Sequence, residues 1–318
     1  MMETNLTDIS SFETPFWCFN GHVHTIARSF FGDSNKPLCQ RIEIPTPDGD
    51  FLELDVINQK NKQPVIALFH GLEGSTDRYY IIEMMKELSA RNYSVVAVNF
   101  RGCGSRLNNK MRFYHSGETQ DYSTVFNWIA KTFPTQKRGA VGFSLGGNAL
   151  LKFLAEQHEH KPDAAVAVSV PYNLKRGCLA ISQGFNRIYE YRFMRTLRKK
   201  LNDKRECFPQ LPTYSGSTLY RFDDEVTAPV HGFDDAEDYY AQCSSKKFIP
   251  FINVPSLLIH SRQDPLCPVD EMPVKKIKEN SLTDYIITEE GGHVGFWSSP
   301  RGWLNQTIMN YFLNKFDS

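Results

Sequence analysis

The decisive stretch of the chain runs Gly139-Ala140-Val141-Gly142-Phe143-Ser144-Leu145-Gly146-Gly147-Asn148-Ala149-Leu150-Leu151. An apolar, strand-forming segment precedes the serine, and a helix-forming segment follows it. A sharp turn between strand and helix forces the serine into a strained backbone conformation, so the residues two positions away on each side must be small. Glycine occupies both of those positions. The stretch therefore predicts a nucleophile elbow with Ser144 at its tip.

Short β-branched runs alternate with longer amphipathic segments from about residue 41 onward. This alternation predicts an α/β fold with a mostly parallel, doubly wound sheet. We expect a hairpin from 41–44 and 51–57, strands at 65–69, 94–100, 138–143 and 164–170, and helices at 79–92, 118–132 and 145–157. A strand at 254–260, a helix at 270–279, a strand at 283–289 and a helix at 301–316 complete the prediction.

The alternation stops between residues 171 and 253, where aromatic, charged and proline residues are frequent. We interpret 171–253 as a helical cap inserted into a core made of 41–170 and 254–318. Residues 1–40 are predicted to form an extension packed on that core. A chain of 318 residues with 41% hydrophobic content is long enough for one such domain.

Composition limits the classes of function. The 36 basic and 36 acidic residues balance, so no whole-molecule field attracts nucleic acid. Seven scattered cysteines, a polar N-terminus without a secretory signal and the lack of a long apolar run predict a cytoplasmic protein with no integral membrane segment. No phosphate-binding loop or dinucleotide motif occurs, so no cofactor is expected. The oligomeric state is left open.

A serine hydroxyl needs a general base, and an imidazole serves as that base when a carboxylate fixes its tautomer. His293 lies in a glycine-rich loop after the last predicted strand, and Asp264 follows the strand before it. Asp270 is a nearby rival for the acid. The chain order serine, aspartate, histidine is typical of α/β-hydrolases. Ser144, Asp264 and His293 are therefore the predicted catalytic residues.

The oxyanion of an acyl-transfer reaction needs two backbone N–H donors. Leu145, directly after the serine, is predicted to supply one of them. The loop His70-Gly71-Leu72-Glu73-Gly74 follows the third predicted strand, and its glycines allow a close approach to the elbow. Leu72 is our candidate for the second amide. His70 is expected to pack the loop and to have no catalytic role.

The chain resembles the α/β-hydrolase superfamily and, within it, the YheT-like branch, also called the AB hydrolase 4 family. The similarity covers nearly the whole chain. Beyond the elbow it rests on Asn20-Gly21-His22 with Thr25, His70-Gly71-Leu72-Glu73-Gly74, Asn99-Phe100-Arg101-Gly102-Cys103, Tyr114-His115-Ser116-Gly117, Phe222-Asp223-Asp224, Thr227-Ala228-Pro229, His231-Gly232-Phe233, Asp238-Tyr239-Tyr240, Asp264-Pro265 and Gly292-His293.

The resemblance implies a serine hydrolase of carboxylic esters, whose substrates are short- to medium-chain acyl esters or lipid-like esters. Ser144, Asp264 and His293 match the triad positions of the family. Some relatives transfer acyl groups to small alcohols, so acyl transfer is the nearest alternative. A hydrolase-fold module that binds a ligand without turnover is a further alternative, although an intact serine, acid and base argue against it.

Several segments allow more than one interpretation. A helix over 188–205 has an apolar stripe at Ile188, Tyr191, Met194, Leu197 and Leu201 with basic residues around it. This helix leaves contact with anionic lipid or with the phosphates of coenzyme A open, and the aromatic residues Phe16, Trp17, Phe19, Phe30 and Phe31 leave membrane contact open. Ordinary packing is favoured for both segments.

Three further features have structural interpretations. Arg101 is expected to brace loops through backbone carbonyls, with binding of a carboxylate or phosphate as the alternative. Cys103 is not expected to act as a nucleophile. The pairs His22 with His24 and His158 with His160 lack the cluster of ligands that a metal site needs, so no metal is predicted.

Overall fold

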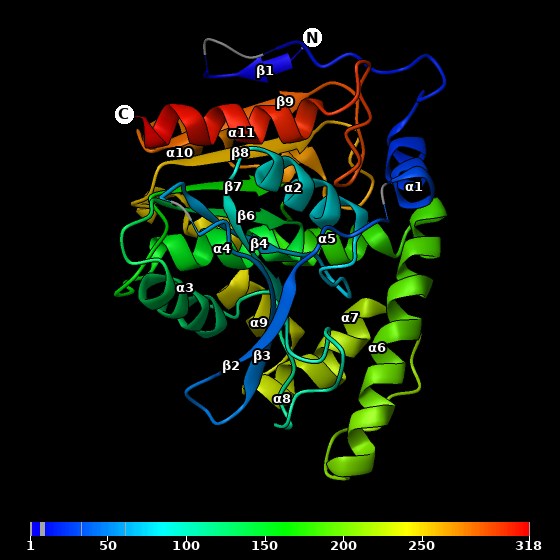
Figure 1. The fold of residues 1–318 in the computed structure, drawn as a ribbon. Helices are drawn as coiled ribbons and strands as arrows, with labels where there is room; N and C mark the ends of the chain where they lie inside the picture. Colours follow the sequence, from blue (N-terminus) through cyan, green and yellow to red (C-terminus); the bar gives the residue numbers. More distant parts are fainter. Residues whose placement is uncertain (1, 7–9, 33, 61, 318) are drawn as a thin grey trace.

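The computed structural model describes residues 2–6, 10–32, 34–60 and 62–317, without the side chains of residues 28–30, so the aromatic ring of Phe30 lies outside the described part. Within it, nine strands form one sheet in the order β1-β9-β8-β7-β6-β4-β5-β3-β2 (Figure 1). The strands are β1 (Met2–Thr4), β2 (Gln40–Pro45), β3 (Phe51–Ile57), β4 (Val65–Phe69), β5 (Ser94–Asn99), β6 (Arg138–Phe143), β7 (Ala164–Val168), β8 (Ser256–Ser261) and β9 (Thr283–Thr288).

The centre of the sheet is parallel, from β5 through β4, β6, β7 and β8 to β9. The predicted hairpin is confirmed, since β2 and β3 pair antiparallel with Pro45 opposite Phe51. One edge was not predicted. There β1 pairs antiparallel with β9, placing Met2 opposite Thr288. A three-residue strand is too short to show a period in sequence.

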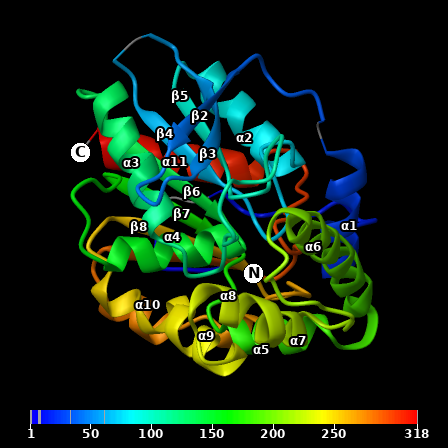
Figure 2. The same cartoon turned by 90° about the horizontal axis from the view of Figure 1, so that it is seen from below.

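Helices cover both faces of the sheet (Figures 1 and 2). On one face α2 (Tyr79–Ala90) and α11 (Trp303–Phe316) bury their apolar sides, and on the other α3 (Gln120–Thr132), α4 (Leu145–Ala155) and α10 (Val274–Glu279) do so. Because both faces are covered, β4 is buried along its whole length. The predicted doubly wound α/β sheet is confirmed.

One predicted helix starts later than expected. The pattern placed it at 270–279, but α10 begins only at Val274. Pro273 lies directly before it, and Met272 is extended with φ −66° and ψ 121°. A residue before proline is driven out of the helical region by the proline ring, so the helix cannot begin earlier.

The segment between β7 and β8 holds the helices that roof the carboxyl edge of the sheet, with α6 the longest of them (Figure 1). They are α5 (Leu174–Ile181), α6 (Arg187–Cys207), α7 (Leu219–Phe222), a π-helical turn (Asp223–Thr227), α8 (Ala228–His231) and α9 (Ala236–Cys243). Near the N-terminus, the helix α1 (Gly21–Phe31) lies beside the start of α6. No helix in the described ranges is long and apolar enough to cross a bilayer.

Candidate active site

Ser144 lies at the turn from β6 to α4 and has the strained backbone that the sequence predicts, with φ 54° and ψ −121°. Its N–H donates to the carbonyl of Val168 at 2.8 Å. A Cβ on Gly146 would lie 2.4 Å from the carbonyl oxygen of His70, and one on Gly142 would lie 2.7 Å from that of Gly146. Neither position can carry a side chain without moving backbone, so the two glycines are required by the turn.

The structure brings the three predicted catalytic residues together. His293 Nε2 lies 2.9 Å from Ser144 Oγ. On the other side of the ring, His293 Nδ1 lies 3.1 Å from Asp264 Oδ1 and 3.0 Å from Oδ2. An imidazole that donates from Nδ1 to a carboxylate presents Nε2 as an acceptor, so it can take a proton from the hydroxyl.

Asp264 is buried and held in place by backbone. Its Oδ1 accepts from the N–H groups of Leu266 and Cys267, both at 2.9 Å. Burial by itself would raise the pKa of this carboxyl, but the neighbouring imidazoles of His293 and His260 and the Cys267 amide outweigh it and lower the pKa. Asp270, the alternative candidate for the acid, is exposed on the surface, where its Oδ2 lies 3.7 Å from Arg176 Nη2.

The loop that carries His293 is fixed by α1, a contact that no local sequence pattern predicts. The Thr25 hydroxyl accepts from the His293 N–H at 2.8 Å and donates to the Gly21 carbonyl at 2.7 Å. A Cβ on Gly292 would lie 2.4 Å from the same carbonyl oxygen, so the two segments touch. The motif Asn20-Gly21-His22 with Thr25 was the available signal, but a motif alone does not say what it contacts.

The loop of Leu72 lies against the elbow. A Cβ on Gly71 would lie 3.0 Å from the Ser144 Cβ, which places the following amide beside the serine. No acceptor within the described ranges takes the N–H of Leu72 or of Leu145. Two unoccupied amides on either side of a serine are the arrangement that an oxyanion needs.

His70 packs this loop, as predicted. The ring is buried, its Nδ1 lies 2.7 Å from the Gly71 carbonyl, and its Nε2 accepts from the Phe100 N–H at 3.2 Å. Burial lowers the pKa of His70 to about 3, so the ring is neutral and suited to this structural task.

A buried ion pair ties the cap to the same loop. Lys200 of α6 donates to Glu73 Oε1 at 2.6 Å, next to Leu72 in the chain. Lys200 Nζ also lies 3.2 Å from Cys103 Sγ. Burial raises the pKa of the Cys103 thiol in spite of that lysine, so the cysteine stays protonated and is a poor nucleophile.

A cavity of about 990 Å³, including its open mouth, lies between the elbow and the cap. Ser144 and His293 line it at the sheet edge. Most of the remaining lining is apolar and comes from the cap, including Leu174, Ile181, Phe193, Leu197 and Leu219. Its largely apolar lining fits an acyl chain or a small ester.

Arg101 braces loops, as predicted, but its predicted partners were wrong. The guanidinium is buried and pairs with Asp48 at 2.8 Å, Asp50 at 3.0 Å and Asp121 at 2.7 Å, so its partners are carboxylates and not backbone carbonyls. Three acids satisfy this single cation, and it is therefore part of the core and not an anion site.

The histidine pairs have separate structural contacts. His22 Nδ1 lies 3.2 Å from the Tyr189 hydroxyl, and His24 Nδ1 accepts from the Trp297 N–H at 3.2 Å. His158 lies 3.2 Å from Glu156 and stacks on Phe153. His160 Nε2 lies 3.6 Å from Glu159 instead. The members of each pair thus have different neighbours and do not converge on one point.

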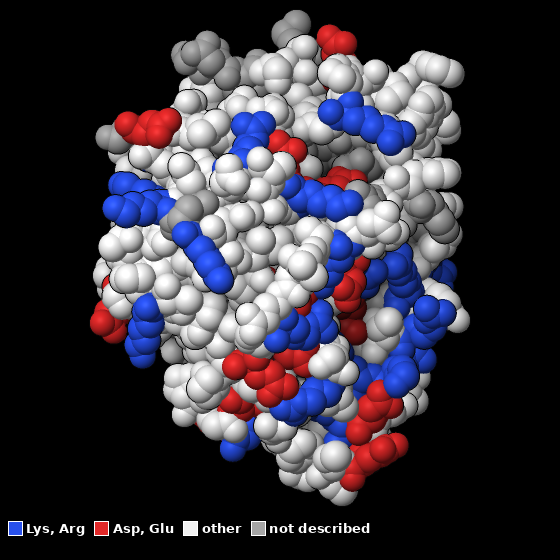
Figure 3. Space-filling view, viewed as in Figure 1, with Lys and Arg blue, Asp and Glu red and all other residues white. Residues whose placement is uncertain are grey.

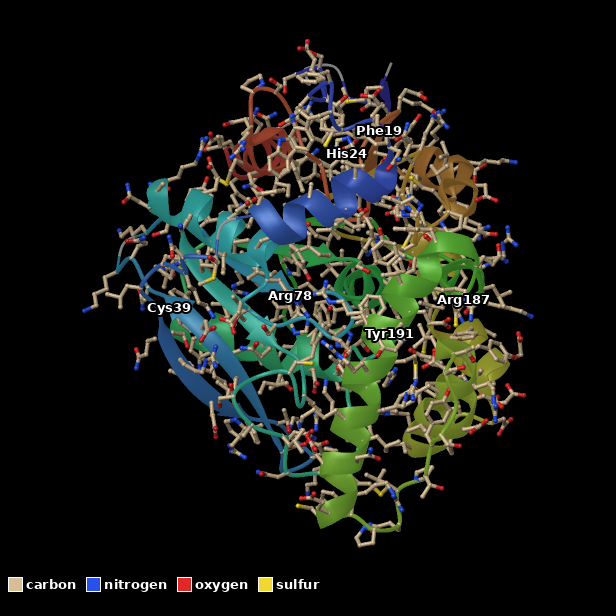
Figure 4. All side chains as sticks on the ribbon, turned by 90° about the vertical axis from the view of Figure 1, so that its right-hand side faces the viewer. Phe19, His24, Cys39, Arg78, Arg187 and Tyr191 are labelled. Atoms are coloured by element: carbon tan, nitrogen blue, oxygen red, sulfur yellow. The ribbon has the colours of Figure 1, made fainter. Side chains whose placement is uncertain are left out.

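The basic helix and the N-terminal aromatic residues are more exposed than packing predicts. In α6 the buried stripe begins only at Met194, because Ile188 and Tyr191 are 55% and 68% exposed. Phe16 and Phe19 are 97% and 73% exposed, and Figure 4 shows Phe19 and Tyr191 on the side where α1 meets α6. Figure 3 shows basic side chains gathered over α6.

Comparison with known proteins identifies the family. Residues 64–300 match the alpha/beta hydrolase fold family. The chain is 36% identical to "Putative esterase YheT" of Escherichia coli (strain K12), over 92% of this chain and 90% of that protein. It is 27% identical to the monoacylglycerol lipase of Saccharomyces cerevisiae, over 87% of this chain and 64% of that protein.

Solved structures show the same fold. The Pyrococcus furiosus esterase Pf2001 superposes with a TM-score of 0.62 at 19% identity, covering 90% of this chain and 97% of the other. Relatives named as an esterase and a lipase support a hydrolase of the ester type. The chain belongs to the α/β-hydrolase family and, within it, to the YheT-like branch.

Proposed function

We propose that the protein hydrolyses carboxylic esters, with short- to medium-chain or lipid-like acyl groups, through an acyl-enzyme on Ser144. The observation that carries the proposal is the hydrogen-bonded chain from Ser144 through His293 to Asp264, with 2.9 Å between Oγ and Nε2 and 3.0 Å between Nδ1 and Oδ2. This hydrogen-bonded chain opens onto a largely apolar cavity. In our proposal the cavity binds the acyl group.

In the first half of the reaction, Ser144 Oγ attacks the acyl carbonyl while His293 Nε2 takes the hydroxyl proton. The amides of Leu72 and Leu145 stabilise the oxyanion, and Asp264 stabilises the imidazolium. The proton then passes to the oxygen of the leaving alcohol. In the second half, His293 takes a proton from water, the hydroxide attacks the acyl-enzyme, and the acid leaves as Ser144 regains its proton.

The test is turnover of p-nitrophenyl esters of increasing acyl length by the wild type and by Ser144→Ala. We expect kcat to fall by about 10⁴-fold or more in the variant, because the base and oxyanion amides then have no nucleophile to act with. Ser281→Ala, an exposed serine outside the cavity, is the matched control and should keep full activity. Equal turnover by Ser144→Ala and wild type would refute the proposal.

A product analysis with added ethanol belongs to the same experiment. Hydrolysis yields the free acid, whereas acyl transfer yields the ethyl ester from the same acyl-enzyme. Dominance of the ethyl ester at low ethanol concentration would show that an alcohol competes better than water for the acyl group, and the protein would then be an acyltransferase.

A further inference from the structure

The helix α6 has a buried face and an exposed face that both carry apolar residues. Met194, Leu197 and Leu201 are buried in one apolar cluster of the cap, and Leu197 also lines the cavity. Residues three or four positions apart on the other side of the helix share its solvent face. Two apolar and three basic side chains lie there, all of them exposed: Ile188, Tyr191, Arg192, Arg195 and Lys199. Apolar residues flanked by basic ones are typical of helices that lie along a membrane surface.

Further apolar side chains lie beside the start of α6. Phe185, in the turn before the helix, is 53% exposed, and its ring lies 4.8 Å from that of His22 in α1. His22 also stacks on Tyr189, with 6.0 Å between the ring centroids. Phe19 precedes α1 and lies on the same side of the molecule as Tyr191 (Figure 4). We call the exposed apolar group at this junction the apolar rim, and it consists of Phe19, Phe185, Ile188 and Tyr191. Exposed apolar side chains that gather in one place, unlike single ones, mark an interaction site.

The arginines of this surface have no acidic partners. Arg187, Arg192 and Arg195, which we call the rim arginines, form no ion pair within the part of the chain that the structure describes. Arg187 begins α6, where the positive end of the helix dipole disfavours a cation. Partial burial and the charges of Arg78 and Arg195 lower the pKa of Arg192, so these guanidinium groups repel one another. A negatively charged partner would relieve that repulsion.

The apolar rim borders the active site. Thr25 of α1 accepts from the backbone N–H of His293 at 2.8 Å. Phe193 lines the cavity, whereas its neighbour in α6, Arg192, is exposed on the outer face. The two helices at the rim are thus the ones that hold the catalytic loop and cover the cavity. A partner bound at the rim therefore lies next to the cavity.

Charge distinguishes a bilayer from a second copy of the chain as the partner. In a two-fold dimer the same surface of each copy faces the other, so the rim arginines of both copies would meet and repel. A bilayer that contains anionic lipid supplies negative charge at its surface and apolar chains just beneath it. Both features complement this surface, so the bilayer fits better.

We propose that the apolar rim and the rim arginines dock the protein on the surface of a bilayer that contains anionic lipid. The apolar side chains enter the headgroup region, and the arginines pair with lipid phosphates. The inference goes beyond ester hydrolysis, because docking needs no bond to be made or broken and does not require the Ser144 hydroxyl.

The experiment is sedimentation of the full-length protein with vesicles, and it measures the bound fraction at each lipid concentration. Vesicles of phosphatidylcholine alone are compared with vesicles in which about a third of the lipid is phosphatidylglycerol. We expect the wild type to bind the anionic vesicles about tenfold more tightly, or more, and to lose this preference as NaCl is raised, because salt screens the charges. Ser144→Ala should bind as the wild type does.

Two double variants test the two parts of the surface. Arg192→Glu with Arg195→Glu should weaken binding to anionic vesicles by about tenfold or more, since each basic residue near such a surface contributes about fivefold. Phe19→Ser with Ile188→Ser should weaken binding to both kinds of vesicle severalfold, because it removes apolar area from the headgroup region.

The matched control is Lys62→Glu with Lys137→Glu. It changes the net charge as much as the arginine variant does, but these exposed lysines precede β4 and β6, at the edge of the sheet opposite the active site. The control should bind anionic vesicles nearly as tightly as the wild type. All three double variants should keep the wild-type kcat/KM on a soluble p-nitrophenyl ester, which shows that they are folded.

The outcomes separate docking from the proposed function. A wild type that hydrolyses p-nitrophenyl esters but does not bind anionic vesicles at low salt would overturn docking alone. Equal binding by the two test variants and the control would also overturn it, because another surface would then bind the lipid. A lipid-free dimer that becomes monomeric in Phe19→Ser with Ile188→Ser, without vesicle binding, would assign the rim to a second copy. Vesicle binding without turnover of any ester would overturn the proposed function and leave docking in place.

Discussion

Polar side chains at the edge of the sheet and in the cap differ in how many hydrogen-bond partners they have. At the edge, the groups closest to Ser144 have fixed partners: His293 has Asp264, and Asp264 has two backbone amides. In the cap, Asp223 has only hydroxyl partners and His231 Nε2 has none within the described residues. The reacting residues are therefore preorganised by the fold, whereas the cap retains hydrogen-bonding capacity that a ligand can use.

The same contrast holds for backbone. The elbow and the loops around it depend on close contacts that only glycine allows, such as Gly146 beside the His70 carbonyl and Gly292 beside α1. The cap meets this edge largely through side chains, among them the ion pair of Lys200 with Glu73. We infer that the cap can change its lining residues without disturbing the elbow, which is how one fold serves different substrates.

Arg101→Met should give the largest loss of stability. It removes one buried cation from three carboxylates, so the free energy of unfolding should fall by about 5 kcal/mol. Urea unfolding followed by circular dichroism measures this loss. An unchanged unfolding midpoint would show that the network at this end of the sheet does not stabilise the core.

Lys200→Met should cost less, about 3 kcal/mol, because it leaves one buried acid, Glu73, without its cation. It should also lower kcat more than it raises KM, because Glu73 adjoins the Leu72 amide. The double variant Lys200→Met with Glu73→Gln should regain part of the stability. If the double variant is as unstable as the sum of the single variants, the pair is not coupled.

Asp223→Asn should change how stability depends on pH. Burial raises the pKa of Asp223 to about 6, above its value in the unfolded chain, so the folded state binds the proton more tightly. Wild-type stability therefore loses a contribution as pH rises from about 4 to 6, and the variant lacks this loss. Relative to the wild type, the variant should gain about 2 kcal/mol over that window in urea titrations.

Parallel pH profiles for the wild type and Asp223→Asn would contradict this assignment. The measured quantity is the difference in stability between the wild type and the variant at each pH. This difference is needed because buried histidines change the pH dependence of stability in the opposite direction. Burial lowers the pKa of His70 to about 3, so its contribution to stability falls as pH falls, equally in both proteins.

Lys199→Ala should have the smallest effect, below about 0.5 kcal/mol, because both partners of its ion pair with Asp203 are exposed. The thermal unfolding temperatures of Lys199→Ala and Lys200→Met are measured under the same conditions, which compares two neighbouring lysines on one helix. A loss as large as that of Lys200→Met would show that position on α6, and not burial of the charge, controls the effect.

Local patterns predicted the core because strands, elbow and glycines depend on neighbouring residues. The strained φ of Ser144 and the positions of β4, β5 and β6 follow from periodicity and turn chemistry. Asp264 and His293 could be assigned because loops after parallel strands meet at one edge of the sheet.

Long-range contacts could not be predicted from one sequence. Thr25 and His293 are 268 positions apart, and nothing local to either residue indicates their hydrogen bond. The stripe on α6 predicted a buried face but not where the buried part of the helix begins, so Ile188 and Tyr191 were misassigned. Asp223 and His231 were visible as motif residues, but whether a polar atom has a partner depends on the whole fold.

The central claim is that Ser144 is an activated nucleophile, and covalent labelling tests it most directly. A fluorophosphonate probe is reacted with the wild type, Ser144→Ala and Ser281→Ala, followed by intact-mass measurement and peptide mapping. We predict a single adduct on Ser144 in the wild type and the Ser281→Ala control, and none in Ser144→Ala. Equal labelling of Ser144→Ala, or an unlabelled wild type that still hydrolyses esters, would contradict the claim.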